Sequence, residues 1–530
     1  MNIKDKNNTY NTLFHWHNFR FKLVGEGVIV GLLSGLLIVF YRYLIEKTSY
    51  IMKNIYSYSS HNIGRILILF IGLVLCGYII GRMAKKDPMC TGSGIPQVEG
   101  ILLRKLDMNW FSVITKKFIG GVLALAAGLS LGREGPSVQM GACIGQGFSR
   151  IFKRIKIEEK FLITSGASAG LAAAFNAPLA GVIFALEEIH KNFSPLILLS
   201  AMSASLTADF ISKQFLGLKP VLNFKDTRIL PLRYYLYLII LGIIIGIFGI
   251  LFNKTLLKTQ DIYKKQKWLP VEFRPIIPFI IAGILGLTMP NLLGGGHKLI
   301  MSLTKCSFSI KLLLVFIVIK FFFTMISYGS GVPGGIFFPL LVIGALTGDV
   351  YGQLLVKYIH LSPDFVENFI ILAMAGYFTA IVKAPITGSI LITEMTGSFH
   401  HLLPLTIVSI TCYLVTDLLN SNPIYESLLE KLLKNNTTNE FVGDHNKKIL
   451  LEFAVTLGSV IEGEKIKNLK WPKSCLLVAV KRGEHELIPK GDTTIYGGDY
   501  LLVLVDEDMA SGIRDVIEEM CRECDVKQDT

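Results

Sequence analysis

The sequence predicts an all-α polytopic membrane protein that is followed by a small α+β domain. Of the 530 residues, 51% are hydrophobic and 18% are charged, and the mean hydropathy is +0.51. Apolar stretches such as residues 234–252 and 311–326 are long enough, or nearly so, to cross about 30 Å of hydrocarbon. The long apolar segments end near residue 433. Short runs in which apolar and polar residues alternate, as in strands, follow them.

The amino-terminal residues are polar and basic. Residues 1–22 lack the apolar stretch of a cleavable signal peptide, and they carry four Lys or Arg residues against one acid, Asp5. Basic segments beside a span stay on the cytoplasmic side of the membrane. We therefore predict that residues 1–21 are a cytoplasmic segment. The net charge of +13 is dispersed among the spans, which argues against nucleic acid as a partner.

An internal repeat divides the membrane part into halves at about residues 22–215 and 233–435. "APLAGVIFALEE" and "APITGSILITEM" share the spacing of Pro, Gly and Glu, and their offset is 207 residues. Pro136, Gly141 and Gly145 match Pro339, Gly344 and Gly348 at an offset of 203, and "CTGSG" matches "LGGGH" at about 202. Three matches in order at nearly constant offset indicate a duplicated unit, as in many transporters. Several apolar segments are also too short to span, which predicts broken helices inside the bilayer.

Four segments predict helix amino ends that could face an anion. They are residues 92–96 ("GSGIP"), 132–136 ("GREGP"), 331–339 ("GVPGGIFFP") and 420–425 ("NSNPIY"). In each, small or polar residues precede a proline, which is favoured in the first turn of a helix. The amino end of a helix presents unpaired N–H groups and a partial positive charge. Several such ends at one place would bind an anion without a full cation.

"GSGIP", "GREGP" and "GGIFFP", in this order and separation, resemble the three signature segments of the chloride channel (CLC) family of channels and proton-coupled transporters. "PLAGVIFALEE" and "NPIYESLL" fit the same pattern, and the resemblance covers roughly residues 20–435. It implies an inverted repeat of tilted and broken helices, and a homodimer with one anion pathway in each subunit. The expected partners are chloride and other small anions together with membrane lipid.

The resemblance also implies the anion site. Hydroxyls of Ser93 and Tyr425 and backbone amides of Ile336 and Phe337 would hold the central chloride. Amides around Arg133 to Gly135 would serve an outer position. Serine at position 93 points to chloride, because relatives with proline there favour nitrate. Supporting positions in the first segment are Gly92, Gly94 and Pro96.

Two glutamates are the predicted proton groups. An ionisable residue inside membrane helices costs about 2.5–3.5 kcal/mol and is by default a functional-site hypothesis. Glu134 matches the family's gating glutamate, which competes with the anion when charged and leaves when protonated. Glu188 aligns with the internal proton-transfer glutamate, where many passive channels carry an apolar residue. Glu187 matches Glu394 in the repeat, and this symmetry suggests a structural role.

Glu99 and Lys117 occupy positions that correspond to a buried charge pair in relatives, so we expect them to support the site. No metal or organic cofactor is implied, and the chain lacks the HExxH, Walker and GxSxG motifs. Cys521 and Cys524 form a lone CxxC without a partner pair, which is a weak metal or redox signal.

The carboxyl-terminal part has its own resemblance. Residues 436–448 form a polar linker, and residues 449–530 resemble the carboxyl-terminal (TrkA-C) subdomain of regulatory modules attached to bacterial potassium transporters. The carrying residues are "GSVIEGEKIKNL" and "LLVAVKRGEHELIPKGDTTIYGGDYLLVLVD". This implies a cytosolic regulatory domain in a prokaryotic protein, with a small-molecule ligand as one expectation. A plain dimerisation or stability domain is the alternative that the residues leave open.

The sequence therefore predicts a proton-coupled chloride antiporter in a prokaryotic cell membrane, with both termini cytoplasmic. The nearest alternative is a passive voltage- or ligand-gated chloride channel of the same fold. An intramembrane enzyme would need a nucleophile with a base or paired aspartates, and the short helices contain neither. A sensor that works only through its tail would leave the four helix starts unexplained.

Overall fold

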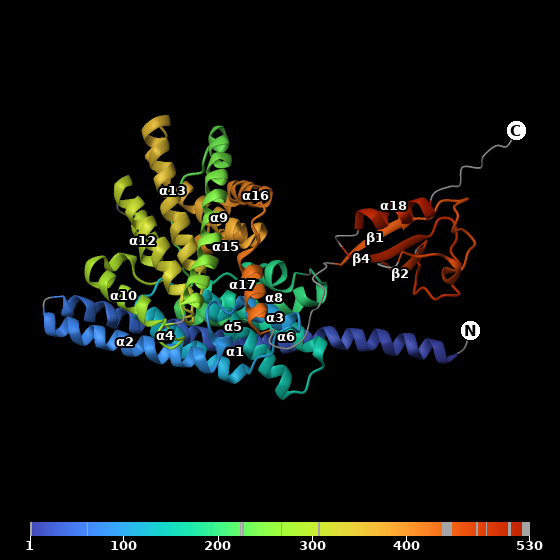
Figure 1. Cartoon of the computed structure of the whole chain (residues 1–530), viewed down its shortest axis with the longest axis horizontal. Coiled ribbons are helices and arrows are strands. Elements are labelled where there is room, and N and C mark those ends of the chain that lie inside the picture. The colour runs from blue at the N-terminus through green and yellow to red at the C-terminus, as the bar shows by residue number, and fades with distance from the viewer. Residues whose placement is uncertain are drawn as a thin grey trace. The chain divides into compact units, whose positions relative to one another are not determined.

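The computed structural model describes residues 3–60, 62–191, 193–222, 224, 227–266, 268–305, 308–436, 448–472, 475–483, 485–506 and 510–521. The chain forms two compact units, Met1–Asn436 and Thr437–Thr530. Helices make up the described part of the first unit, and the second combines a sheet with a helix (Figure 1). The predicted fold class is confirmed. The predicted linker lies almost entirely outside the described residues.

Over the residues that the structure describes, the first unit contains two successive sets of eight α-helices and a last helix, α17. The first set is α1 (Ile3–Ser59), α2 (Ile63–Lys86), α3 (Ile95–Leu102), α4 (Trp110–Ala126), α5 (Glu134–Ile151), α6 (Lys156–Phe175), α7 (Pro178–Phe184) and α8 (Pro195–Leu216). The second set is α9 (Tyr235–Lys265), α10 (Ile276–Thr288), α11 (His297–Leu303), α12 (Ile310–Gly329), α13 (Phe337–Ile359), α14 (Val366–Val382), α15 (Pro385–Thr396) and α16 (Leu402–Leu418), and α17 is Ile424–Asn436. Among the described residues, eight helices are long and apolar enough to cross a membrane.

Helix α1 crosses the predicted domain boundary. It begins at Ile3 and runs without a break to Ser59, and its part that is apolar enough to cross a membrane begins at Phe21, next to the predicted start of the membrane domain at residue 22. The polar residues before residue 22 therefore extend the helix instead of forming a separate element. Helices α6 and α14 are each followed by a residue in the left-handed conformation, Asn176 and Lys383. A proline then starts the next helix in each half.

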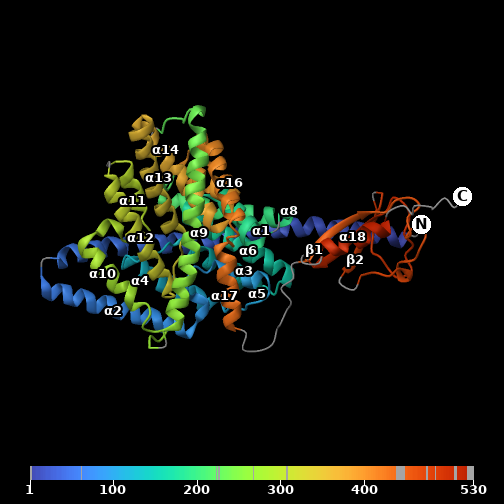
Figure 2. The same cartoon turned by 45° about the horizontal axis from the view of Figure 1, so that its top comes forward.

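The two sets of helices pack alike. Helix α1 packs on α6 and α8, and its counterpart α9 packs on α14 and α16. Likewise, α5 packs along α6, and α13 along α14 (Figure 2). The glycines that revealed the repeat lie at these last two crossings. A Cβ on Gly141 or Gly145 would overlap the α6 backbone, and one on Gly344 or Gly348 would crowd the α14 backbone. Glycine is needed there because the helix backbones touch.

The halves are related by a local two-fold axis. Gly132 and Gly335 form an isolated antiparallel bridge, in which each N–H donates to the other residue's carbonyl oxygen at 2.6 and 2.8 Å. These glycines are counterparts at the repeat offset of 203 residues. Two equivalent surfaces that contact each other reciprocally require a two-fold relation. The inverted repeat is therefore built around the segments "GREGP" and "GGIFFP".

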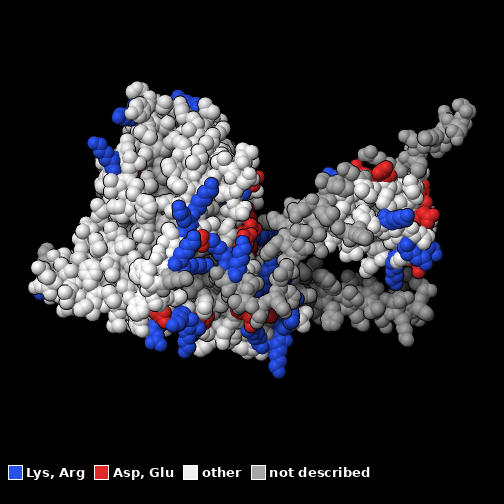
Figure 3. Space-filling view, in the orientation of Figure 1, with Lys and Arg blue, Asp and Glu red and all other residues white. Residues whose placement is uncertain are grey.

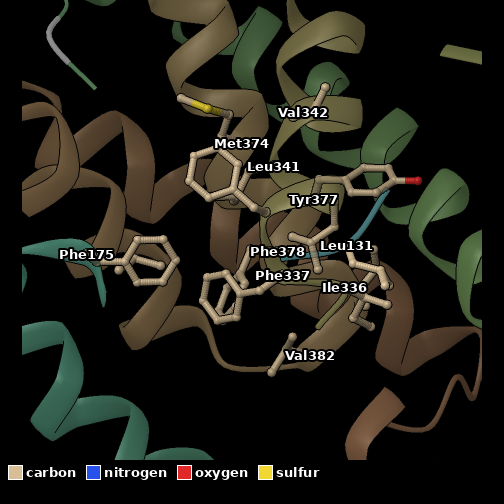
Figure 4. Close-up of a cluster of buried hydrophobic side chains, with 14 of the residues drawn as sticks. Leu131, Phe175, Ile336, Phe337, Leu341, Val342, Met374, Tyr377, Phe378 and Val382 are labelled. Carbon is tan, nitrogen blue, oxygen red and sulfur yellow. The ribbon is translucent and has the colours of Figure 1, made fainter. Parts of the chain in front are cut away.

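Buried aromatic rings hold the start of α13 in place (Figure 4). The ring of Phe337 lies 4.7 Å from that of Phe378 on α14 and 5.1 Å from that of Phe175 on α6, between ring centroids. It also meets Phe184 of α7 edge-on, at 6.2 Å. Aromatic pairs at such separations contribute about 0.5–1.5 kcal/mol beyond area burial. Elements from both halves thus fix one helix amino end.

The surface of the helical unit suits a bilayer. In Figure 3 broad areas carry no Lys, Arg, Asp or Glu, and the charged side chains gather in separate patches. Large apolar side chains lie exposed on its surface: Ile68 is 70% exposed and Leu236 is 66% exposed. Contiguous exposed apolar surface of this kind marks contact with lipid or with another protein. The chain is a membrane protein.

The described part of the second unit contains a four-stranded antiparallel sheet and one α-helix. The strands are β1 (Lys448–Ala454), β2 (Cys475–Arg482), β3 (His485–Leu487) and β4 (Tyr500–Asp506), in the order β1-β4-β2-β3, and α18 (Ala510–Cys521) packs on β1 and β4. Phe453, Val503 and Ile517 belong to its separate hydrophobic core. Cys521 is buried in that core, while Cys524 lies outside the described residues.

An ion pair braces the turn before β4. The Nε and Nη2 atoms of Arg482 donate to the two carboxylate oxygens of Asp499, each at 2.8 Å. The Tyr496 N–H donates to the same carboxylate at 2.9 Å, and the guanidinium lies over the Tyr496 ring. Burial alone would raise the pKa of Asp499, but these donors outweigh it and hold the pKa below its ordinary value.

We predict that Asp499→Asn destabilises this unit by about 1–3 kcal/mol at neutral pH, because a charge-assisted bidentate contact is lost. The pKa of Asp499 is lower in the folded than in the unfolded state. The stabilisation by its ion pair is therefore fully present above the unfolded pKa of about 4. It disappears as the pH falls through the folded pKa. Thermal unfolding of residues 437–530 with and without the substitution should therefore converge at acidic pH. A constant difference at all pH values would contradict this.

Candidate anion and proton site

All four predicted helix starts begin helices. Gly94, in the left-handed region at φ 92°, precedes α3, and Arg133 precedes α5. Ile336 precedes α13, and α17 begins after Pro423. The first N–H groups of each helix have no acceptor within it. The local signals in the sequence were therefore correct about where these amino ends lie.

The starts of α3, α5 and α13 meet. The N–H of Gly334 donates to the carbonyl oxygen of Gly92 at 3.0 Å, which ties the third segment to the first. Gly135 lies against Ser93: a Cβ there would come within 2.8 Å of the Ser93 carbonyl oxygen. A Cβ on Gly335 would in turn lie 3.2 Å from the Gly135 amide nitrogen. Helix α17 packs on α3 and completes the group.

Two buried hydroxyls are left without partners at this meeting point. Ser93 is 1% exposed and Tyr425 is fully buried, and neither hydroxyl oxygen has a hydrogen-bond partner among the described residues. The Tyr425 hydroxyl lies beside that of Ser93, and Tyr425 is within electrostatic reach of Tyr328, Glu134 and Glu188. Buried polar groups are nearly always paired, and an unpaired one calls for an explanation. A ligand that accepts from both hydroxyls would supply it.

The predicted backbone donors lie nearby. Ile336 and Phe337 are buried at the start of α13, and their amides are among those without an intrahelical acceptor. Gly135 stands in the first turn of α5, directly against Ser93. The Arg133 side chain points elsewhere, since its Nη1 pairs with Glu46 of α1 at 3.1 Å. For Arg133 only the backbone is thus in position to serve an anion.

Glu134 begins α5 and is 1% exposed. The backbone N–H groups of Glu134 itself and of Phe338 face its carboxylate, which therefore occupies the gap between the starts of α5 and α13. Its Oε2 has no hydrogen-bond partner among the described residues. A carboxylate at two helix amino ends takes the place that an anion would take.

Glu134 also lines an outer cavity of about 660 Å³. The basic residues along its wall are Arg42, Lys53, Arg133, Lys219 and Lys298. Arg42 was not singled out from the sequence; it is buried, and its Nη1 donates to the Ala173 carbonyl and to the side chains of Asn176 and Ser212. Two acidic residues, Glu46 and Glu134, also line the cavity, so its wall carries a net positive charge, which concentrates anions.

Glu188 lies in a π-helix, η2 (Ala185–His190), that continues α7. It is 4% exposed, and its Oε1 has no hydrogen-bond partner among the described residues. Glu134 and Glu188 both lie within electrostatic reach of the Tyr425 phenol. Both predicted proton groups therefore lie in the neighbourhood of Tyr425. π-Helices are rare and frequently occur at functional positions.

Glu187, in contrast to Glu188, caps the start of a helix in the other half of the repeat. Its carboxylate accepts from Ile386 N–H at 3.3 Å and from Thr387 N–H at 2.8 Å, at the start of α15. Glu394 of α15 does the same at the start of α7, where the Leu179 and Ala180 N–H groups donate to it at 3.2 and 2.8 Å. These reciprocal caps join the halves, which supports the structural role suggested for Glu187.

The expected pair of Glu99 and Lys117 is not present. Glu99 instead pairs with Lys191, whose Nζ lies 2.8 Å from its Oε1. The Nζ of Lys117 donates to the carbonyl oxygens of Cys90, Thr91 and Gly92, at 3.1, 3.3 and 2.7 Å. The predicted pairing was wrong, because backbone carbonyls at the turn before α3 satisfy the buried ammonium. That both residues support the site stays a prediction.

Lys320 repeats the role of Lys117 in the second half and was missed. Both side chains are fully buried, and the Nζ of Lys320 donates to the carbonyl oxygens of Leu292 and Gly294 at 3.0 and 2.5 Å. The offset between the two lysines is 203 residues, so the repeat could have revealed it. Tyr328, near Gly92 and Tyr425, was missed too. A single tyrosine in an apolar stretch gives no local signal.

We predict that Lys117→Met weakens chloride binding about tenfold, which corresponds to about 1.4 kcal/mol. The substitution leaves three carbonyls without their charged donor and loosens the turn that carries Ser93. Calorimetric titration with chloride measures the affinity. Lys116→Met is the control, because Lys116 pairs with Asp87 and does not contact this turn in the described structure. Equal affinities in both variants would contradict the prediction.

Among the described residues, no group of three or more His, Cys, Asp or Glu side chains could hold a metal ion. His297 begins α11, and its Nε2 lies 2.7 Å from the Val221 carbonyl oxygen.

Comparisons with known proteins agree with this geometry. Residues 72–417 match the family model described as voltage gated chloride channel, and residues 450–517 match the TrkA-C domain. The H(+)/Cl(-) exchange transporter ClcA of Vibrio campbellii is 34% identical over 433 residues, which cover 78% of this chain and 90% of that protein. The protein of the same name from Klebsiella pneumoniae is 35% identical over 367 residues, covering 68% and 77%.

Comparison with solved structures also matches the chain to CLC-type antiporters. A slow cyanobacterial Cl-/H+ antiporter superposes with a TM-score of 0.75 at 30% identity, covering 78% of this chain and 98% of that one. A CLC-type fluoride/proton antiporter gives 0.63 at 26% identity, covering 76% and 97%. The recurrent helix starts, the inverted repeat and these matches lead to one conclusion: the chain belongs to the voltage gated chloride channel (CLC) family, and it carries a TrkA-C domain after the membrane unit.

Proposed function

We propose that this protein exchanges chloride for protons across a prokaryotic cell membrane, through a pathway within each subunit. The observation that carries the proposal is the position of Glu134, a buried carboxylate between the starts of α5 and α13. It stands between the outer cavity and the unpartnered hydroxyls of Ser93 and Tyr425. The relatives named as H(+)/Cl(-) exchange transporters support the same activity.

In the proposed mechanism, chloride occupies the centre of the site. The hydroxyls of Ser93 and Tyr425 and the amides of Ile336 and Phe337 donate to it and replace its hydration shell. Amides of Arg133 to Gly135 serve the outer position. Helix amino ends and hydroxyls bind an anion without a full cation, at about 0.3–2 kcal/mol for each helix end. Weak donors of this kind allow release as well as capture.

Glu134 couples the two ions in this proposal. When it is charged, its carboxylate takes the outer anion position and accepts the N–H groups there. When it gains a proton, it no longer competes for these donors, and chloride can replace it. A buried carboxylate without a cation partner is costly as an ion, which favours its protonation as the anion leaves. Glu188 is the inner group that receives the proton from the cytoplasm.

The assembly and orientation are part of the proposal. We infer a homodimer in lipid with both termini in the cytoplasm, from the family resemblance and the basic amino-terminal residues. The TrkA-C domain is a cytosolic regulatory module in this view, and a small-molecule ligand is one way it would act. Light scattering of the detergent-solubilised protein tests the dimer.

Reconstituted liposomes test the exchange. Liposomes loaded with chloride are diluted into a medium low in chloride, and a pH electrode follows the outside. Exchange carries protons inward as chloride leaves, so the external medium becomes alkaline. A passive channel does the opposite, because chloride efflux makes the interior positive and drives protons out. Alkalinisation that a protonophore reverses supports the antiporter. Chloride efflux with external acidification would identify a channel.

A further inference from the structure

One ammonium group ties three elements together at the inner side of the site. Lys191 ends η2 in the left-handed conformation, at φ 53°. Its Nζ lies 2.8 Å from Glu99 Oε1 of α3, and it also contacts the Glu426 carboxylate of α17. Glu99 is buried, whereas the side chains of Lys191 and Glu426 are each 37% exposed. The cluster therefore reaches from the buried site to the solvent.

These three elements also carry the residues of the proposed pathway. Helix α3 follows Ser93, α17 carries Tyr425 next to Glu426, and η2 carries Glu188 three residues before Lys191. Lys191, Glu99 and Glu426 all lie within electrostatic reach of Glu188. The cluster of Lys191, Glu99 and Glu426 is thus the charged environment of the inner glutamate.

The remaining ionisable neighbours contribute less. Glu187 is on the same element, but its carboxylate caps α15. His190 bonds through Nδ1 to Thr164 of α6, and Lys160 of the same helix lies near His190. With both glutamates ionised, Lys191, Glu99 and Glu426 together carry a net charge of −1. Without the Lys191 ammonium, the net charge of the cluster would be −2, beside the buried carboxyl group of Glu188.

We propose that Lys191 is a positioning residue for the inner proton acceptor. Its ammonium holds Glu99 and Glu426 beside Glu188 and sets the pH at which Glu188 takes up a proton. This rests on the proposed exchange function. An opposite charge near a carboxyl group favours its ionised form, and a like charge favours its protonated form. Protonation of Glu188 should therefore follow the net charge of the cluster.

Charge variants separate this role from a mechanical one. Lys191→Met changes the net charge of the cluster to −2, and Glu426→Gln changes it to 0. The double variant with both substitutions returns it to −1. We expect Glu188 to titrate about one pH unit higher in Lys191→Met and lower in Glu426→Gln. In the double variant the midpoint should return close to that of the unaltered protein.

A purely structural bridge gives a different pattern. Both single substitutions break the contact between Lys191 and Glu426, and Lys191→Met also breaks the contact with Glu99. A structural role would therefore change the rate in the same direction in both, and the double variant would not recover. Lys383→Met is a matched control, because Lys383 also ends a helix in the left-handed conformation and pairs with an acid, Asp417. In Lys383→Met, the midpoint of the Glu188 titration should equal that of the unaltered protein.

The measurement is an infrared pH titration of the full-length protein, with the Glu188 carboxyl band identified by its loss in Glu188→Gln. The pH profile of chloride-driven proton uptake in liposomes should shift in the same order. Midpoints that do not follow the net charge of the cluster overturn the inference, even if exchange is present. If the unaltered protein moves chloride without protons, the exchange function fails, and the inference fails with it.

Discussion

Glu134→Gln should abolish the external alkalinisation of chloride-loaded liposomes while chloride efflux continues. The amide has nearly the shape of the carboxyl group, so the starts of α5 and α13 keep their packing. It does not titrate, however, and a side chain that cannot take up a proton cannot carry one. We expect proton movement to fall to the leak rate of liposomes without protein. Parallel recordings with pH and chloride electrodes measure both ions.

The outer cavity offers a matched control for this substitution. Glu46 lines the same cavity and pairs with Arg133, but its side chain is 59% exposed and it stands on α1. Glu46→Gln removes a carboxylate from the same cavity and breaks only a side-chain contact of Arg133, whose backbone is the part proposed to serve the anion. Its proton coupling should equal that of the unaltered protein. Persistent chloride-driven proton uptake in Glu134→Gln would remove Glu134 from the proton pathway.

Gly135→Ala should abolish measurable chloride binding. A Cβ at this position would lie 2.8 Å from the Ser93 carbonyl oxygen, and nearer still to its hydroxyl oxygen. Real Cβ atoms essentially never approach so closely, so the Ser93 turn must move away from α5. A hydrogen bond to a charged group contributes about 1.5–3 kcal/mol. Loss of one donor then weakens binding by roughly 10–100-fold, and displacement of the turn affects more than one.

Calorimetric titration with chloride and thermal unfolding measure the two consequences of this change. Gly72→Ala in α2 is the control, because no atom lies within 4 Å of the added Cβ. Its chloride affinity should equal that of the unaltered protein. A folded Gly135→Ala protein with unchanged affinity would show that Ser93 and the start of α5 do not form the site.

Local sequence signals gave much of the fold and part of the site. Proline after small residues marked four helix starts, because the ring fixes φ and lacks the N–H that is unpaired there. The repeated glycines marked two crossings where helix backbones touch. Glu134 stood out because a carboxylate inside apolar segments is costly. Each of these signals depends on a few neighbouring residues and needs no knowledge of packing.

Tertiary structure alone decided which side chains meet. The sequence suggested Glu99 with Lys117, but Lys191 reaches Glu99 from η2, and carbonyls satisfy Lys117. The reciprocal caps of Glu187 and Glu394 join segments about 200 residues apart, so the spacing could show their symmetry but not their partners. A buried charge takes whichever partner the packed helices bring near it, since leaving it unpaired costs more than any local preference supplies. The chain thus specified its helices and their breaks locally, whereas the pairing of its buried charges depended on how the two halves pack.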